Sequence, residues 1–262
     1  MSRLDDTMRA ASARGHKVLV AYLCMGDPSH EESIDLAVAA AEAGADVLEL
    51  GVPFSDPTAD GPAIARATER ALAAGGGLAR SLDAARAIRA RTDKPLLLFG
   101  YYNPIFVRGE SRTAADARDA GVDGLLVVDL PVEEAGTLRA ACRDAGLSLA
   151  PLVTPTSSAP RIALTKRAIA ECDPGFVYYV SLAGVTGAAS APLAEASARA
   201  GALRTELGAP VVVGFGIDTP EKAKLAAEHA DGVVVGSALV RLVPDRAAVT
   251  GLIRAIRAAI PD

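Results

Sequence analysis

The sequence predicts an α/β fold, a closed (β/α)8 TIM barrel formed by one domain over residues 1–262. Three observations support this prediction. Short apolar runs alternate with longer segments of helical periodicity, the runs are apolar at successive positions, and there are eight of them. Continuous apolar runs are typical of parallel strands that are covered on both faces. Eight such strands fit a closed barrel better than an open doubly wound sheet, which usually has fewer.

The expected strands are rich in Val and Leu. They cover residues 18–23, 47–50, 96–99, 125–128, 147–152, 176–180, 211–213 and 233–235. Apolar residues at helical spacing in the segments between them, as in 193–207 and 249–260, predict helices that pack on the sheet. Asp27 to Ser29 and Thr219 to Glu221 have the pattern of an N-cap next to a proline. Glycines 44, 121, 146 and 208 are expected to end helices in the left-handed conformation.

Composition excludes several classes of function. The formal net charge is −5, and the arginines are scattered along predicted helices, so we expect no binding of DNA or RNA. Half of the residues are hydrophobic, which is enough for a substantial core. The uncharged stretch 174–194 is interrupted by Gly and Pro, which argues against a membrane span.

Three cysteines without a CxxC motif indicate a reducing compartment and no zinc site. The N-terminus lacks the apolar segment of a secretion signal, so we expect a cytoplasmic protein. His16, His30 and His229 have no mutual spacing for a metal site or a catalytic triad, and we expect them at the surface. Fingerprints for nucleotide binding and for metallopeptidases are missing from the sequence, so neither a metal nor a nucleotide cofactor is expected.

The densest group of carboxylates, prolines and glycines is LELGVPFSDPTADG, residues 48–61. It follows the second strand, at the end of the barrel where active sites form in this fold. Glu49 lies within the strand and must point opposite to its leucine neighbours, either into the barrel or toward the helices, and an unpaired charge is costly in both places. A glutamate satisfied by backbone groups is the alternative. Asp60 could act in catalysis or cap the helix that begins at Pro62, and Asp56 could stabilise a turn.

Glycines follow three successive strands near the end of the chain. They occur in GVTG at 184–187, in GFG at 214–216, and in Gly236 before Ser237. Glycines at adjacent strand ends let backbone N–H groups approach an anion, and the last loops of such barrels often bind phosphate. We therefore predict a phosphate site here, with ordinary tight turns as the alternative.

At residues 48–61 the chain closely resembles the tryptophan synthase alpha chain family. The resemblance continues in GDP at 26–28, YYNPIF at 101–106, GVDGLLVVDLP at 121–131, YYVSLAGVTGA at 178–188, VVVGFGIDTPE at 211–221 and DGVVVGSALV at 231–240, and it covers almost the whole chain. It implies a lyase of tryptophan biosynthesis that cleaves indole-3-glycerol phosphate to indole and glyceraldehyde 3-phosphate.

The resemblance also implies residue roles. Glu49 would be the general acid and base, and Asp60 would stabilise the ring nitrogen. The residues that would line the indole pocket are Tyr22, Phe99, Tyr101 and Leu126. The phosphate would be held by Gly187, Gly216, Gly236 and Ser237, with Phe215 and Tyr178 nearby. Thr186 would meet Asp60 when the loop after the sixth strand closes.

This chain departs from the family pattern at Thr58, Ala65 and Leu182, and these departures bear on loop closure and on the response to a partner. The resemblance implies an α2β2 complex with a tryptophan synthase beta chain, which alone would carry pyridoxal phosphate. Pro53, Asp56 and Asn103 would lie in loops that face this partner.

Two other readings remain open. The chain could be a freestanding lyase that needs no beta chain, or a weakly catalytic barrel that acts as an allosteric activator of one. A phosphosugar isomerase on the same fold is disfavoured, because the expected strand ends lack a convincing pair of Glu with His or Lys.

Overall fold

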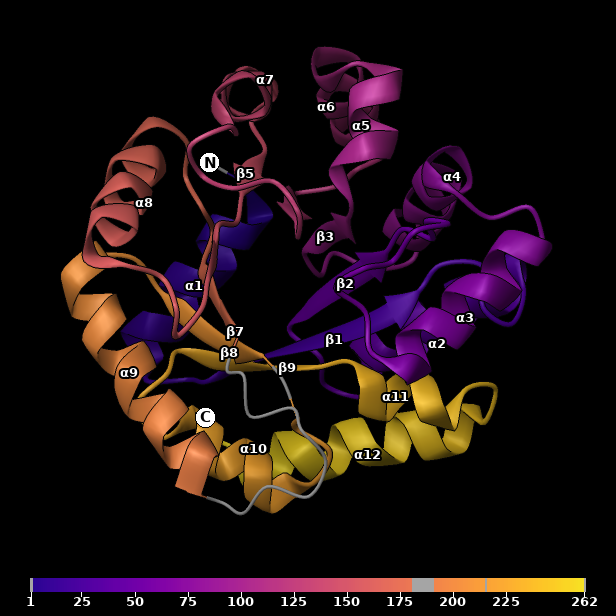
Figure 1. Cartoon of the computed structure of the whole chain (residues 1–262). Helices are drawn as coiled ribbons and strands as arrows, with labels where there is room; N and C mark the ends of the chain where they lie inside the picture. Colours follow the sequence, from indigo (N-terminus) through magenta and orange to yellow (C-terminus); the bar gives the residue numbers. More distant parts are fainter. Residues whose placement is uncertain (1, 181–190, 215, 262) are drawn as a thin grey trace.

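The computed structural model shows a barrel of parallel strands surrounded by helices (Figure 1). The structure describes residues 2–180, 191–214 and 216–261. The strands are β1 Val18–Cys24, β2 Val47–Gly51, β3 Leu96–Gly100, β4 Gly124–Val127, β5 Ser148–Leu149, β6 Leu152–Val153, β7 Val177–Val180, β8 Val211–Gly214 and β9 Gly232–Val235. Their order in the sheet is β5-β4-β3-β2-β1-β9-β8-β7-β6, with all pairs parallel.

Helices surround this sheet. They are α1 Arg3–Arg14, α2 His30–Glu42, α3 Pro62–Ala73, α4 Leu78–Arg89, α5 Tyr102–Arg108, α6 Glu110–Asp119, α7 Gly136–Ala145, α8 Ala159–Glu171, α9 Ala191–Leu207, α10 Pro220–Ala227, α11 Ser237–Leu242 and α12 Arg246–Ala259. No helix in the described part of the chain is long and apolar enough to cross a membrane. The ring of parallel strands and the helices around it confirm the predicted TIM barrel.

The fifth predicted strand, 147–152, is wrong in one respect. It is broken into β5 and β6 by Ala150 and Pro151, and only its two halves pair with neighbours. Proline has no N–H to give to a ladder. The segment nevertheless closes the barrel, because Ala150 N donates to Leu125 O at 2.9 Å on one side and Pro151 O accepts from Tyr178 N at 2.9 Å on the other.

The predicted helix boundaries are largely confirmed. Thr219 caps α10 with Pro220 in its first turn, and glycines 44, 121, 146 and 208 all have positive φ. Ser29 caps α2 through its side chain, but Pro28 precedes the cap and does not begin the helix. His16 was expected at the surface and is instead half-buried, with its ring 3.0 Å from the Asp46 carboxylate.

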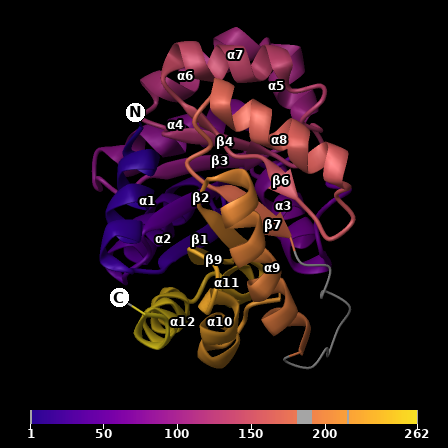
Figure 2. The ribbon, with the colours of Figure 1, turned by 90° about the vertical axis from the view of Figure 1, so that its left-hand side faces the viewer.

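Two apolar layers hold the barrel together. The outer layer lies between strands and helices, and the inner one fills the barrel with residues such as Val20, Leu97 and Val212. Helix α1 contributes Leu4 and Met8 to the inner layer, so this helix covers the N-terminal ends of the strands (Figure 2). The opposite, C-terminal end is the face seen in Figure 1, where a site can open.

We expect the substitution Leu4→Ala to destabilise the protein by about 2–5 kcal/mol, because Leu4 is fully buried against the inner layer and its loss leaves a cavity. Urea unfolding followed by circular dichroism measures this change. Arg14→Ala, on the exposed surface of the same helix, is the control and should cost less than about 0.5 kcal/mol. Equal effects of the two substitutions would mean that α1 does not close the barrel.

Candidate active site

The alternation of side chains along β2 directs Glu49 into the barrel. Leu48 and Leu50 belong to the outer apolar layer, and Val47 belongs to the inner layer. Because successive side chains of a strand point to opposite faces, Glu49 lies on the same face as Val47. The sequence left two directions open for this carboxyl group, and the structure selects the interior.

The environment of Glu49 favours its uncharged form. The residue is 1% exposed, and in the described part of the structure its Oε1 atom is buried without a hydrogen-bond partner. Burial raises the pKa of the Glu49 carboxyl to about 8. A carboxyl oxygen satisfied by the backbone, the alternative drawn from the sequence, is therefore not what the structure shows for Oε1.

Two tyrosines share the interior with Glu49. Tyr22 of β1 is its register partner, and Tyr178 projects from β7 toward the inner layer. Burial raises the pKa of both hydroxyls, and the Glu49 carboxylate raises each further, so both hydroxyls lie within electrostatic reach of it. A Cβ atom at Gly51 would overlap the Tyr22 hydroxyl, and one at Gly214 would overlap the Tyr178 hydroxyl.

Asp60 lies in the loop between β2 and α3. It does not cap α3, because Gly61 is the N-cap and no side chain caps this helix. Burial raises the pKa of the Asp60 carboxyl to about 6, and a hydrogen bond with Tyr101 opposes the rise. Both Asp60 and Glu49 add to the rise that burial causes in the pKa of the Tyr22 hydroxyl, so both carboxyl groups lie within electrostatic reach of this hydroxyl.

An aromatic wall accompanies the carboxyl groups. The rings of Tyr22 and Phe99 meet edge to face with centroids 5.3 Å apart, and those of Phe54 and Tyr101 are also 5.3 Å apart. Phe99 of β3 pairs in register with Leu126 of β4. Such a wall suits a planar apolar ring.

The sequence analysis did not select Phe54, although this residue lies within the carboxylate-rich segment 48–61. Aromatic character next to predicted site residues was the signal that could have identified it.

The predicted phosphate residues lie at neighbouring strand ends where the structure describes them. Gly216 follows β8 with a φ of 71°, and no atom of the described residues lies within 4 Å of the position its Cβ would take. Gly236 and Ser237 form the junction between β9 and α11, and β9 lies next to β8. Thr186, Gly187, Phe215 and the departure at Leu182 lie outside the described residues.

A part-buried ion pair that sequence reasoning missed connects the first βα loop to α3. The side chain of Asp27 is 1% exposed, and its two oxygens accept from Arg70 Nε at 2.7 Å and Arg70 Nη2 at 2.9 Å. This bidentate contact holds the helix that follows the Asp60 loop against β1. The residues are 43 positions apart, and nothing in their local sequence pairs them.

Within residues 2–180, 191–214 and 216–261, no cluster of three or more His, Cys, Asp or Glu side chains is arranged to hold a metal ion. The three cysteines are buried free thiols.

Comparison with known proteins gives a consistent result. A match to the family described as "Tryptophan synthase alpha chain" spans residues 8–255. The chain is 50% identical over 242 residues to the tryptophan synthase alpha chain of Geobacter sulfurreducens, covering 92% of this chain and 90% of the relative. It is 48% identical over 267 residues to that of Burkholderia mallei, covering 99% and 97%. This chain belongs to the tryptophan synthase alpha chain family.

Solved structures of the family have the same fold. The alpha subunit of tryptophan synthase from Legionella pneumophila superposes with a TM-score of 0.91 at 38% identity, covering 99% of this chain and 98% of that one. A chain of Mycobacterium tuberculosis tryptophan synthase superposes with a TM-score of 0.88 at 36% identity, covering 99% and 98%. As a member of this family, the protein is a carbon–carbon lyase of tryptophan biosynthesis.

Replacing Glu49 with Gln should remove a pH-dependent loss of stability. The ordinary pKa of the group is 4.5, and the folded pKa is about 8, so the folded state holds this proton more tightly. The Glu49 carboxyl therefore contributes its full stabilisation of the folded state below the ordinary pKa. This stabilisation is lost as the pH rises toward the folded pKa, and the loss is on the order of 4 kcal/mol. Urea unfolding at about pH 5 and about pH 9 measures the difference.

The parent should lose more stability than the Glu49→Gln variant over this pH interval. Glu42→Gln serves as the control, because the Glu42 side chain is 68% exposed and its titration should change little on folding. Parallel stability curves for the parent and the Glu49 variant would show that the Glu49 carboxyl is not held in its protonated form.

Proposed function

We propose that this chain cleaves indole-3-glycerol phosphate reversibly to indole and glyceraldehyde 3-phosphate, with Glu49 as general acid and base and Asp60 as the anion beside the ring nitrogen. The observation that carries the proposal is the burial of the Glu49 carboxyl inside the barrel, where Oε1 has no partner in the described structure. Such a group is available to a substrate that enters from the open end.

The reaction needs a proton at indole C3 and the removal of another from the hydroxyl next to the ring. Protonated Glu49 gives its proton to C3, and the positive charge that develops on the ring nitrogen is stabilised by the Asp60 carboxylate. The bond between C3 and the glycerol carbon then breaks, and its electron pair restores the aromatic indole. The hydroxyl becomes the aldehyde and returns its proton to Glu49, so no proton is consumed.

The two carboxyl groups are suited to these different tasks. With a pKa of about 8, Glu49 is protonated near neutral pH, whereas Asp60, with a pKa of about 6, is ionised. Pairs of carboxyls whose environments separate their pKa values commonly divide acid and base work in this way.

The rest of the mouth would hold the substrate. The indole ring would lie against Tyr22, Phe99, Tyr101 and Leu126, which form an apolar and aromatic wall. The phosphate would lie at Gly216, Gly236 and Ser237, with Tyr178 nearby. Gly187, Phe215 and Thr186 are assigned here through the family pattern alone. No cofactor takes part in these steps.

We also propose a tryptophan synthase beta chain as partner in an α2β2 complex, with pyridoxal phosphate confined to that partner. Phe106 and Val107 of α5 support this proposal, because their exposed fractions are 66% and 77% and adjacent large apolar side chains in water often mark an interface. Asn103 is exposed on the same helix, not in a loop as expected, and Asp56 is exposed after β2. Pro53 is buried and cannot provide contact area.

A single experiment separates this proposal from its alternatives. The purified chain is mixed with indole-3-glycerol phosphate, and indole release is measured with and without a beta chain. We expect slow release alone and stimulation by the partner. Fast release without stimulation indicates a freestanding lyase, and negligible release under both conditions indicates an allosteric activator.

We expect a bell-shaped dependence of kcat/KM on pH. Activity should rise as Asp60 ionises near pH 6 and fall as Glu49 loses its proton near pH 8, because kcat/KM reports the pKa values of the free enzyme. Glu49→Gln should lower kcat by about 10²–10⁴-fold while binding of an uncleavable substrate analogue stays nearly unchanged. Turnover of the Gln variant at the parental rate would remove Glu49 from the mechanism.

The phosphate site is tested by Gly236→Val. The added side chain would occupy the space in which backbone N–H groups approach an anion, so affinity for a phosphorylated indole analogue should fall by about tenfold or more, equivalent to about 1.4 kcal/mol. Binding of free indole should hardly change. Isothermal titration of both ligands measures this, and equal weakening of the two would place the phosphate elsewhere.

The partner surface is tested by Phe106→Ser, which removes an exposed apolar ring without disturbing the core. We expect at least about a tenfold loss of affinity for the beta chain, the cost typical of an interface hot spot, with unchanged activity of the isolated chain. Analytical ultracentrifugation measures the association. Arg112→Ser on α6, whose side chain is 72% exposed, is the control. Undiminished association would place the interface on another surface.

A further inference from the structure

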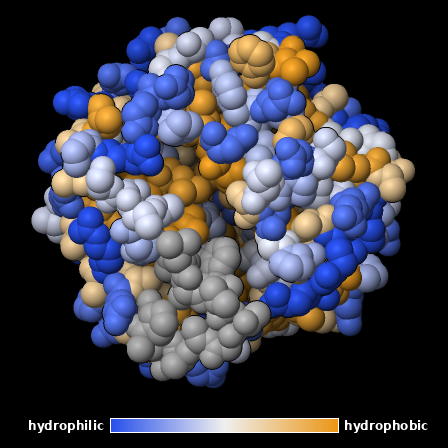
Figure 3. All heavy atoms as spheres, in the orientation of Figure 1, coloured by the Kyte–Doolittle hydropathy of each residue, from blue (hydrophilic) through white to orange (hydrophobic). Residues whose placement is uncertain are grey.

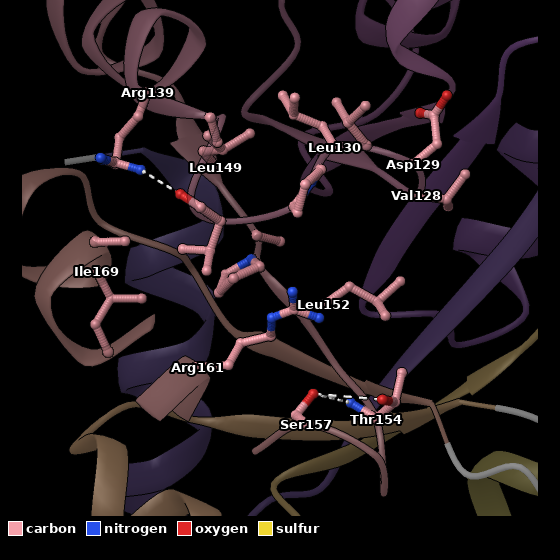
Figure 4. A pocket seen from close by; sticks show the side chains of 17 residues that line it. Val128, Asp129, Leu130, Arg139, Leu149, Leu152, Thr154, Ser157, Arg161 and Ile169 are labelled. Atoms are coloured by element: carbon pink, nitrogen blue, oxygen red, sulfur yellow. Dashed lines mark hydrogen bonds between the residues drawn. The ribbon is translucent and has the colours of Figure 1, made fainter. Parts of the chain in front are cut away.

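A cavity of about 260 Å³ lies beside the barrel mouth, at the ends of β4 to β6 and between α7 and α8 (Figure 4). The break in the fifth strand forms part of its wall, because Ala150 and Pro151 both line it. Neither Glu49 nor Asp60 lines this cavity, so it is separate from the proposed reaction site.

The cavity is chiefly apolar. Leu130, Leu149, Leu152 and Ile169 line it, and Figure 4 shows their side chains around the open space. An apolar cavity of about 150 Å³ holds a benzene molecule, so this one has room for a ring system about the size of two fused rings.

Both cations of the cavity are already neutralised. Arg139 Nε donates to Glu171 at 2.7 Å, and Arg161 Nε donates to Glu133 at 2.9 Å. The carboxylate of Asp129 accepts from Tyr102 N at 2.7 Å. The two arginines of the cavity therefore do not call for an anionic ligand. The planar guanidinium of Arg161, which reaches over the cavity toward Leu152 in Figure 4, can still stack on an aromatic ring.

The cavity shares walls with the reaction site. Val128 and Leu152 line the cavity and also pack on the inner layer of the barrel, which contains Leu126. Figure 3 shows apolar surface gathered near the centre of this same face, with polar residues toward its edge. A neutral aromatic molecule that leaves the barrel mouth therefore meets this cavity at the same rim.

We infer that the cavity is a second binding site for a neutral bicyclic aromatic molecule, namely indole released by the reaction. The choice of indole rests on the proposed function, whereas the size of the cavity, its apolar lining and the pairing of its two arginines do not. The site would retain indole at the rim of the barrel after cleavage.

The experiment uses 5-fluoroindole and fluorine NMR on the full chain. The reaction site is first saturated with indole carrying a propyl phosphate chain, which lacks the hydroxyl group needed for cleavage. We expect saturable binding of 5-fluoroindole to persist. Ala168→Phe, which fills the cavity from α8, should weaken it by at least about tenfold.

Ala170→Phe is the matched control, because Ala170 is exposed on the same helix and does not line the cavity. It should bind 5-fluoroindole like the parent. Arg161→Ala is a second variant that leaves the core intact, since this side chain is 52% exposed. It should weaken binding by about two- to fivefold through the loss of stacking.

Absence of saturable binding once the reaction site is blocked would overturn the inference, and so would equal binding by the two Phe variants. A failure of the proposed function looks different. In that case the phosphorylated analogue itself does not bind. Binding of this analogue is therefore measured by titration before 5-fluoroindole is added.

Discussion

The burial of one carboxyl group inside a closed barrel is the constraint on which the site depends. Folding removes Glu49 from water and leaves Oε1 without a partner in the described structure. The cost of burying a charge makes this group a weak acid. Ring closure through residues 148–153 and the cover that α1 provides at the opposite end keep solvent from the inside of the barrel. An enclosure of this kind is what allows a carboxylic acid to keep its proton near neutral pH.

The position of each carboxyl along the barrel axis sets its chemistry. Glu49 lies within a strand, whereas Asp60 lies in the loop that follows and is half-buried beside Tyr101. The deeper group loses more hydration and becomes the weaker acid. The Asp27–Arg70 pair supports this arrangement from behind, because it holds the helix after the Asp60 loop against the first strand. A structural ion pair thus contributes to the geometry of residues it does not touch.

Much of the fold and part of the site could be predicted from the sequence, because both follow from local patterns. Continuous apolar runs identified the parallel strands, and the position of Glu49 between two leucines reduced its direction to two choices. The interruption at Pro151 was missed, because a run of apolar residues does not show where a ladder loses its N–H donor. The Asp27–Arg70 pair and the half-buried His16 were missed for another reason: their partners, Arg70 and Asp46, are distant in sequence. Only the folded chain brings such pairs together.

The fit between Tyr22 and Gly51 has a consequence for the evolution of this binding chamber. The phenolic oxygen of one strand occupies the volume that a methyl group would take on the next, so the two positions share a single space. A larger residue at position 51 becomes tolerable only after position 22 has shrunk, and the order of these changes is constrained. A library that varies position 51 alone should therefore recover only glycine there, whereas one that varies both positions can recover a larger residue at 51 with a smaller one at 22.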